Sequence, residues 1–258
     1  MSDWFRRLFN PQSLARQIKD APLFEATRLA AWGDPLGTAA LIDVASVYFE
    51  QGDSDTAASR LSLTPEKETF MADERDRLWL DIYQQQGDKE KHTALLTQRF
   101  RNYHSVQMLT ELLDVIGEDK REEVVAKEIK AIFKQAALKL SDADFLMAIE
   151  KIDEAEAYLI KHAGELNGDH YDYLLKLARA MDTEDRYLVA SLMYRSLLNS
   201  ILASARSTAY SHGVRYLKKL DKLAVSIADW LHFDNHQVFK EQLYQTHGRK
   251  RSFWSKYE

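Results

Sequence analysis

Cysteine is missing from all 258 residues of the chain. A disulfide framework and a cysteine-ligated zinc site are therefore excluded, and the composition suits a reducing compartment. Long apolar runs are missing as well, because no segment approaches the roughly 20 apolar residues that a membrane-spanning helix needs. At the N-terminus, Arg6 and Arg7 stand where a secretory signal would continue as an uninterrupted apolar segment. We therefore expect a cytoplasmic protein that does not bind membranes.

Proline is scarce and confined to the first quarter of the chain, at Pro11, Pro22, Pro35 and Pro65. A proline inside a helix costs about 3 kcal/mol, so the long proline-free remainder suits continuous helices, although it would also suit strands. The apolar periodicity distinguishes the two. After Leu36, apolar residues recur three to four positions apart nearly everywhere, and clean alternation is missing. The sequence therefore predicts an all-α protein.

Short glycine turns with an acidic residue separate the first predicted helices, at Gly52, Gly87 and Gly117. Glycine suits a left-handed helix C-cap, and a following aspartate can cap the next helix. The three turns recur at roughly the 34-residue period of tetratricopeptide-type repeats, although the full consensus with its tryptophan and proline positions is missing. We therefore predict a tetratricopeptide-like helical-repeat array, built from antiparallel helix pairs.

Three segments divide the predicted array. Residues 1–35 are expected to cap its first end, residues 36–168 to hold the repeats, and residues 169–258 to form a C-terminal helical region with a basic face. In that last region the apolar pattern extends into longer helices. These are expected at residues 169–181, 185–205, 207–231 and 236–244.

The capping role of the first segment depends on an aromatic face near the N-terminus. This face is formed by Trp4, Phe5, Leu8 and Phe9. An interfacial membrane anchor has a similar pattern. The stretch is short and ends at Pro11, so we favour a first helix that covers the open end of the array.

Four strings in the C-terminal region carry a family resemblance. They are YRSLL at 194–198, ARSTAYSH at 205–212, RYLKKL at 215–220 and HGRKRSFW at 247–254. Together they resemble the C-terminal signature of an uncharacterised bacterial family over about residues 185–256, and related tails occur downstream of SWIM-type zinc fingers. The metal ligands of such a finger are missing from a chain without cysteine. The resemblance implies helical repeats and supplies no known activity.

Charge is divided unevenly along the chain. From Arg186 onward there are twelve lysines and arginines against five acidic residues, a net charge of +7. Because the whole chain carries −5, the first 185 residues carry −12. Such a division indicates a basic surface on an acidic body.

One predicted helix presents a basic stripe. On a helical wheel with about 100° per residue, its four basic residues fall within one sector of about 100°, opposite an apolar stripe. They are Arg215, Lys218, Lys219 and Lys222, and the basic tail adds Arg249, Lys250 and Arg251. We interpret these seven residues as a basic face that binds an acidic partner, although a solvated amphipathic helix would have the same pattern. The neighbouring Phe253 and Trp254 could stack on bases, but we expect them to close the end of the last helix pair.

Arg206 and His212 are the best candidates for catalysis. They have the Arg-x4–6-His spacing of the HEPN class of metal-independent RNases, in which arginine would stabilise developing charge and histidine would act as acid or base. On one continuous helix the two would lie about 120° apart, and they converge only if the helix begins after Arg206. We therefore favour a helix-start arginine and a surface histidine, dispensable for any activity.

Metal and nucleotide sites have less support. His232 and His236 are spaced like zinc ligands but lack the adjacent glutamate and a third ligand. No glycine-rich phosphate loop and no nucleophile elbow is present. We therefore expect no catalytic residue, metal or cofactor.

The leading hypothesis is a non-enzymatic helical-repeat interaction or scaffold protein that binds a partner polypeptide. The alternative is a nucleic-acid-binding module, whose enzymatic form would be a metal-independent RNase using Arg206 and His212. A basic stripe beside a groove with exposed aromatic side chains would favour nucleic acid. An apolar groove with the stripe on the far side would favour a protein partner.

Overall fold

The computed structural model describes residue 16, residues 20–65 and residues 67–258. Within them the chain is helical and contains no strand, which confirms the predicted all-α class. None of the helices in these ranges is long and apolar enough to span a bilayer. The helices pack into two compact units.

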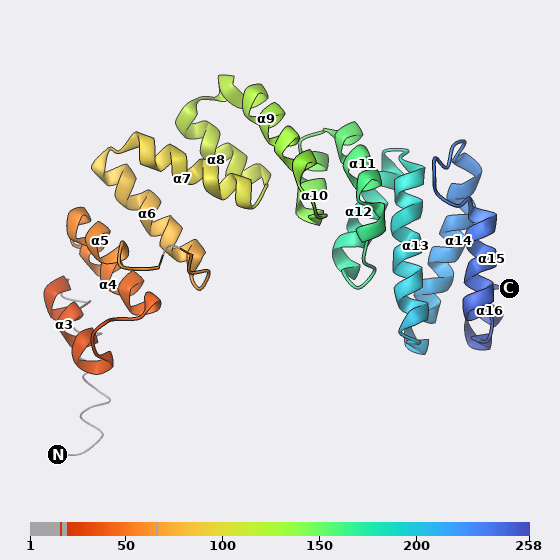
Figure 1. Ribbon diagram of the computed structural model, residues 1–258, viewed down its shortest axis with the longest axis horizontal. Helices are drawn as coiled ribbons and strands as arrows, with labels where there is room; N and C mark the ends of the chain where they lie inside the picture. The colour runs from red at the N-terminus through yellow and green to blue at the C-terminus, as the bar shows by residue number, and fades with distance from the viewer. Residues whose placement is uncertain (1–15, 17–19, 66) are drawn as a thin grey trace, which may run out of the picture. The chain divides into compact units, whose positions relative to one another are not determined.

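The first unit comprises the described part of residues 1–102, together with residues 114–116. Its helices are α3 (Ala21–Trp32), α4 (Thr38–Glu50), α5 (Ser54–Leu61), α6 (Ala72–Gln86) and α7 (Lys89–Asn102) (Figure 1). Helices that are consecutive in sequence pack on one another, α4 against α5 and α6 against α7. The core forms around α4, where Val44 and Ala45 are fully buried and Phe24 of α3 packs with them.

Glycine–aspartate pairs define two of the turns in this unit, as the sequence predicted. Gly52 (φ +94°) and Gly87 (φ +70°) end α4 and α6 in the left-handed conformation that favours glycine. Asp53 and Asp88 directly follow these glycines. Their carboxylates accept hydrogen bonds of 3.0 and 3.1 Å from backbone N–H groups in the first turns of α5 and α7. Each carboxylate thereby satisfies a donor that the start of a helix would leave unpaired.

The second unit comprises residues 103–113 and 117–258. Its α-helices are the first part of α8 (Val106–Ile116), α9 (Arg121–Lys134), α10 (Leu140–Ala148), α11 (Ile152–Lys161), α12 (Tyr171–Thr183), α13 (Tyr187–Ala203), α14 (Tyr210–Ser226), α15 (His236–His247) and α16 (Arg251–Tyr257) (Figure 1). Short 3-10 helices precede three of them, namely η1 (Glu118–Lys120), η2 (Ala163–Glu165) and η3 (Ser207–Ala209).

α13 is the central helix in the C-terminal part of the second unit. It packs against α12 and against α14, and α14 in turn packs against α16. A helix covered in this way buries side chains around most of its circumference. α13 accordingly buries not only its leucines but also the polar Ser191 and Arg195.

Two features of this region differ from the prediction. The helix expected at residues 207–231 begins as η3, continues as α14 and already ends at Ser226. Ile227 leaves the helix in an extended conformation (φ −91°, ψ 103°) and starts a loop of residues 227–235. The basic tail leads into α16, which begins at Arg251 and for which no helix was predicted.

The segments 1–35, 36–168 and 169–258 stay a prediction, as does the tetratricopeptide-like arrangement of the helix pairs. The aromatic face assigned to the capping segment lies outside the described residues. It comprises Trp4, Phe5, Leu8 and Phe9.

Candidate functional site

The basic face begins on α14, whose apolar side packs against α13. Val214 and Leu217 are buried on that side, as the helical wheel predicts. Arg215, Lys218 and Lys222 are exposed on the other side. Three of the four residues of the predicted stripe are therefore accessible to a partner.

Lys219, the fourth residue of the stripe, is engaged within the protein. Its ammonium group lies 2.6 Å from a carboxylate oxygen of Asp182 near the end of α12, and both side chains are partly buried. A lysine held in this way ties α14 to α12. The structure therefore separates Lys219 from the three exposed cations.

An ion-pair network joins α14 to the last two helices. Asp221 of α14 accepts hydrogen bonds from Lys240 (3.1 Å) and Tyr257 (2.7 Å) and lies 2.8 Å from His236 Nε2. Burial raises the pKa of the Asp221 carboxyl, but these hydrogen bonds outweigh burial and hold the pKa below its usual range. The ammonium group of Lys218 lies 5.9 Å from the centre of the Tyr257 ring, so one residue of the basic face borders this network.

The basic tail leads into α16, which packs against α14. Phe253 is 0% exposed and Trp254 is 9% exposed. The indole N–H of Trp254 donates a hydrogen bond of 3.0 Å to the carbonyl oxygen of His247. Both aromatic side chains thus close the last helix pair, which confirms the prediction made for them.

The remaining cations of the face have no ion-pair partner in the described part of the chain. No carboxylate oxygen of a described residue lies within 4.0 Å of their charged groups. They are Arg215, Lys218, Lys222, Arg249, Lys250 and Arg251. All of them are exposed except Lys250, which is partly buried. Cations without an internal partner remain available to an acidic ligand.

Arg206 and His212 share one cavity. α13 ends at Ala203, Ala205 adopts a left-handed conformation (φ +50°), and α14 begins only at Tyr210. The condition for convergence, a helix that begins after Arg206, is therefore met. Both side chains line a cavity of about 300 Å³. Their expected dispensability for activity stays a prediction.

His232 and His236 face different neighbours. His232 is exposed and its ring lies 4.0 Å from the ring of Phe233, whereas His236 contacts Asp221. In the described part of the chain, no group of three or more histidines and acidic residues is arranged to hold a metal ion. The two histidines therefore contribute to packing and to the Asp221 network.

Arg195 is a buried cation that the helical pattern did not single out. It is 7% exposed, donates a hydrogen bond of 2.7 Å to the Asp234 carbonyl oxygen, and lies 4.6 and 4.5 Å from the ring centres of Trp230 and Phe239. Burial lowers its pKa to about 10. Arg195 thus holds the loop 227–235 and α15 onto α13. The only sequence signal for Arg195 was its position in the YRSLL string. The structure indicates that the arginine of this string serves in packing.

A second buried polar cluster lies within the same unit. His104 Nδ1 is 2.8 Å from Asp142 Oδ1, and His104 Nε2 is 3.6 Å from Glu128 Oε2. The imidazole also stacks on Phe145 at 5.5 Å between ring centres. These contacts join the segment before α8 to α9 and α10. Because the residues come from separate elements, no local spacing could have predicted the cluster.

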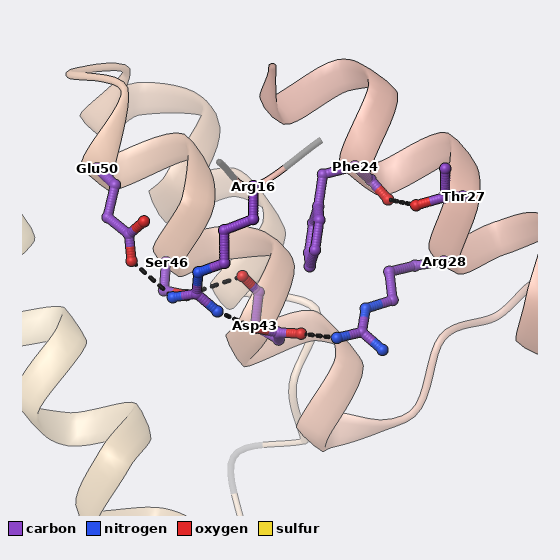
Figure 2. Close-up of polar contacts among 7 residues, drawn as sticks. All are labelled: Arg16, Phe24, Thr27, Arg28, Asp43, Ser46 and Glu50. Carbon is purple, nitrogen blue, oxygen red and sulfur yellow. Dashed lines mark hydrogen bonds and ion pairs between the residues drawn. The ribbon is translucent and has the colours of Figure 1, made fainter. Parts of the chain in front are cut away.

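In the first unit, two arginines converge on one aspartate of α4. Figure 2 shows Asp43 accepting hydrogen bonds from Arg16 (2.8 Å) and Arg28, while Arg16 also contacts Glu50 (2.6 Å). The network connects α3 and the chain at Arg16 to α4. Its charges are matched internally, so we assign it to packing.

A groove of about 760 Å³ with a mixed apolar and charged lining lies elsewhere in the second unit. It is lined mainly by α9 and by the turn between α10 and α11. Its apolar lining includes Val125, Ala126, Ile129 and Ile149, and charged residues of both signs flank it. None of its lining residues comes from α14 or α16, so the groove is separate from the basic face.

The sequence model of one protein family matches residues 26–256, nearly the whole chain. No curated protein and no solved structure matches the chain. The C-terminal strings that resemble an uncharacterised family therefore lie inside a much longer match, whereas the relation to tails of SWIM-type zinc fingers stays a prediction. The chain belongs to the family of unknown function DUF6880.

Proposed function

We propose that this DUF6880 protein is a non-enzymatic, tetratricopeptide-like interaction protein, whose basic C-terminal face binds an acidic segment of a partner polypeptide. One observation carries the proposal. Arg215, Lys218 and Lys222 are exposed on one side of α14, and no carboxylate of a described residue lies within 4.0 Å of them. Lys219 of the same helix differs from these three cations, because it forms an ion pair with Asp182 within the protein.

The charge distribution supports an acidic partner. Residues from 186 onward carry a net charge of +7, so their surroundings do not cancel the field of the face. A patch of one sign raises the association rate of an oppositely charged partner, and this effect falls as ionic strength rises. The exposed cations stand three and four residues apart, so they lie on neighbouring turns of one helix. A polypeptide with closely spaced carboxylates can contact them together.

Two observations favour a polypeptide over nucleic acid. Proteins that bind single strands combine a basic surface with aromatic platforms for the bases. The two aromatic residues of the HGRKRSFW string, Phe253 and Trp254, are buried, and the exposed Tyr244 packs edge-to-face on Trp254. In addition, the groove lined mainly by α9 and the α10–α11 turn combines apolar and charged side chains and lies apart from the basic stripe. A partly apolar groove apart from the stripe suits a protein partner.

The test reverses Arg215, Lys218 and Lys222 to glutamate together and leaves Lys219 in its ion pair. Exposed substitutions of this kind change stability by no more than about 0.5 kcal/mol each, so the variant should fold. An exposed ion pair contributes up to about 1 kcal/mol. At about 0.2–1 kcal/mol each, the loss of three such pairs should lower the affinity for a fluorescent oligoglutamate peptide by about 3-fold to 150-fold.

A matched control reverses three exposed lysines outside the face and so has the same net charge. These are Lys89, Lys127 and Lys139. Fluorescence anisotropy at several salt concentrations compares the proteins with oligoglutamate, single-stranded RNA and duplex DNA. Loss of peptide binding in the face variant alone would support the proposal, whereas equal loss in both variants or unchanged binding would refute it. If the wild type prefers RNA or DNA, and the face variant loses that binding with its salt dependence, the nucleic-acid alternative replaces the proposal.

The enzymatic form of the alternative has one observation in its favour, because Arg206 and His212 line the same cavity. A direct assay incubates the purified protein with RNA in the presence of a metal chelator. We expect the RNA to remain intact. Cleavage that His212→Ala abolishes, with an unchanged circular dichroism spectrum, would instead establish a metal-independent RNase.

A further inference from the structure

The cavity shared by Arg206 and His212 has a mixed apolar and polar lining that includes charges of both signs. It lies within the second unit, where the start of α12, the end of α13 and the start of α14 meet, and has a volume of about 300 Å³. Its polar side chains belong to Asp169, Tyr171, Ser200, Ser204, Arg206 and His212. Sites for small ligands have volumes from about 300 Å³ upward, so the cavity suits a compact ligand.

Arg215 determines which ring nitrogen of His212 carries the proton. Its Nη2 lies 3.0 Å from His212 Nδ1. A guanidinium can only donate hydrogen bonds, so Nδ1 accepts and the proton of the neutral ring lies on Nε2. His212 therefore retains its Nε2–H as a donor for a ligand in the cavity.

The hydroxyl groups of the lining are also oriented. The Tyr216 hydroxyl donates to the Tyr171 oxygen (3.0 Å), which leaves the hydrogen of the Tyr171 hydroxyl available to a ligand. Ser200 donates to Asp169 Oδ1 (2.6 Å), and Ser204 donates to the backbone carbonyl of Ser200 (2.6 Å). The second oxygen of the Asp169 carboxylate can still accept. The lining thus places N–H and O–H donors beside one carboxylate acceptor.

Arg206 reaches the cavity because the chain breaks sharply between α13 and α14. The preceding Ala205 adopts a left-handed conformation (φ +50°), which is unfavourable for a residue with a Cβ atom. The short η3 then leads into α14. No carboxylate oxygen of a described residue lies within 4.0 Å of the Arg206 guanidinium. Strained backbone of this kind is often found where it positions a functional side chain.

We propose that this cavity binds a phosphate monoester that carries a hydroxyl group, as in a sugar phosphate or a ribonucleotide. The Arg206 guanidinium matches phosphate oxygens in a bidentate arrangement, and His212 Nε2–H adds a third donor. The Asp169 carboxylate accepts a hydrogen bond from the ligand hydroxyl, and its charge disfavours an anion that lacks one. Neither Lys218 nor Lys222 lines the cavity, so the cavity shares with the basic face only Arg215, which contacts His212.

Isothermal titration calorimetry of the full chain tests the proposal with ribose 5-phosphate, adenosine 5′-monophosphate, ribose and sulfate. We expect both phosphate esters to bind, and ribose and sulfate to bind at least about tenfold more weakly, because ribose lacks the anionic group and sulfate has no hydroxyl at neutral pH. Arg206→Gln should reduce the affinity for the esters at least about tenfold, since it removes charge-assisted hydrogen bonds. Asp169→Asn should reduce the preference for ribose 5-phosphate over sulfate.

Arg77→Gln is the matched control, because it removes the same charge from an exposed position outside both the cavity and the basic face. It should bind the esters like the wild type, and circular dichroism should show all variants folded. Tighter binding of ribose 5-phosphate would identify sugar phosphates as the ligands, and tighter binding of the nucleotide would identify ribonucleotides. The proposal is overturned if neither ester binds at millimolar concentration, or if Arg206→Gln binds them no more weakly than Arg77→Gln.

Discussion

Replacing Phe253 with alanine would remove the side chain that closes the last helix pair. The ring is fully buried, lies 5.7 Å from the Tyr210 ring in an edge-to-face arrangement, and lies 5.2 Å from the Trp254 ring. It packs so closely on Gly213 that a Cβ atom there would approach the ring to 3.0 Å. Truncation of a phenylalanine to alanine at such a buried site lowers the free energy of unfolding by about 3–5 kcal/mol. Since the free energy of unfolding of a whole domain is about 5–15 kcal/mol, we expect the second unit to lose a large share of its stability.

Urea unfolding, followed by circular dichroism and tryptophan fluorescence, measures this loss. Because the helices pack into two compact units, the curves should be fitted with two transitions. Arg251→Ala on the same helix is the control, because this exposed residue should change the free energy of unfolding by less than about 0.5 kcal/mol.

The competing role for Phe253, stacking on bases, predicts the opposite pattern. Phe253→Leu keeps most of the apolar volume and removes the aromatic ring, so it should cost no more than about 1.5 kcal/mol if packing is the role. Base stacking would instead show as lost affinity for single-stranded RNA, by about 1–3 kcal/mol, with little change in stability. That result, or a loss below about 1 kcal/mol for Phe253→Ala, would refute the packing role.

Three further changes test contacts that join helices. Because the pKa of Asp221 lies below its ordinary value of 3.8 in the folded state, its stabilisation is present above that value and is lost as pH falls through the folded pKa. As pH falls to about 2, the urea midpoint of Asp221→Asn should therefore decrease less steeply than that of the wild type. Parallel plots of midpoint against pH for the two proteins would contradict this. Asp43→Asn leaves two partly exposed arginines without their shared carboxylate. It should therefore destabilise the first unit by about 1–2 kcal/mol in urea unfolding. Glu50→Gln should lower the free energy of unfolding by less than about 0.5 kcal/mol. Gly168→Ala should lower the free energy of unfolding by about 1–3 kcal/mol, because the added Cβ would lie 2.8 Å from a backbone carbonyl carbon of α13. Its control is Gly164→Ala, whose added Cβ meets open space and which should be nearly neutral in the same urea unfolding.

Most helices could be predicted because their signals are local. The pairs Gly52–Asp53 and Gly87–Asp88 end one helix and cap the next through their own backbone and side chains. Later turns have no such marker, since Glu150 (φ +61°) and Asp185 (φ +59°) adopt the left-handed conformation without glycine. Apolar spacing alone indicated those boundaries, with less precision.

The end of α14 shows a tertiary contact overriding a local pattern. Ile227 and Leu231 continue the apolar spacing of the helix, so the sequence predicted helix through residue 231. In the structure the chain leaves the helix after Ser226, and Trp230 packs on the guanidinium of Arg195. The spacing of residues on one helix contains no information about a partner on another helix.

The same distinction applies to the candidate sites. Exposure of Lys218 and Lys222 followed from the wheel, because it depends only on their own helix. The ion pair of Lys219 depends on Asp182 of α12. In the sequence, Asp182 is separated from α14 by the turn before α13 and by the whole of α13. The cavity depends on side chains from three elements. Sequence spacing could propose Arg206 and His212 as a pair, but only the start of α14 at Tyr210 brings both to one cavity.

Arg215 belongs to both proposed sites, and this overlap determines which variants distinguish them. As a cation it contributes to the basic face, and as a donor to Nδ1 it keeps the proton of His212 on Nε2. Glutamate at this position cannot donate at neutral pH, so Nδ1 would lose its donor and the proton of the neutral ring would no longer be held on Nε2.

The triple reversal of the face should therefore weaken both oligoglutamate and ribose 5-phosphate. Reversal of Lys218 and Lys222 alone should weaken only the peptide, because neither residue lines the cavity. Arg206→Gln should weaken only the sugar phosphate. A Lys218 and Lys222 variant that loses both ligands would show that face and cavity form one site. Unchanged binding of ribose 5-phosphate after reversal of Arg215 would show that the contact of Arg215 with Nδ1 does not control how His212 binds the ligand.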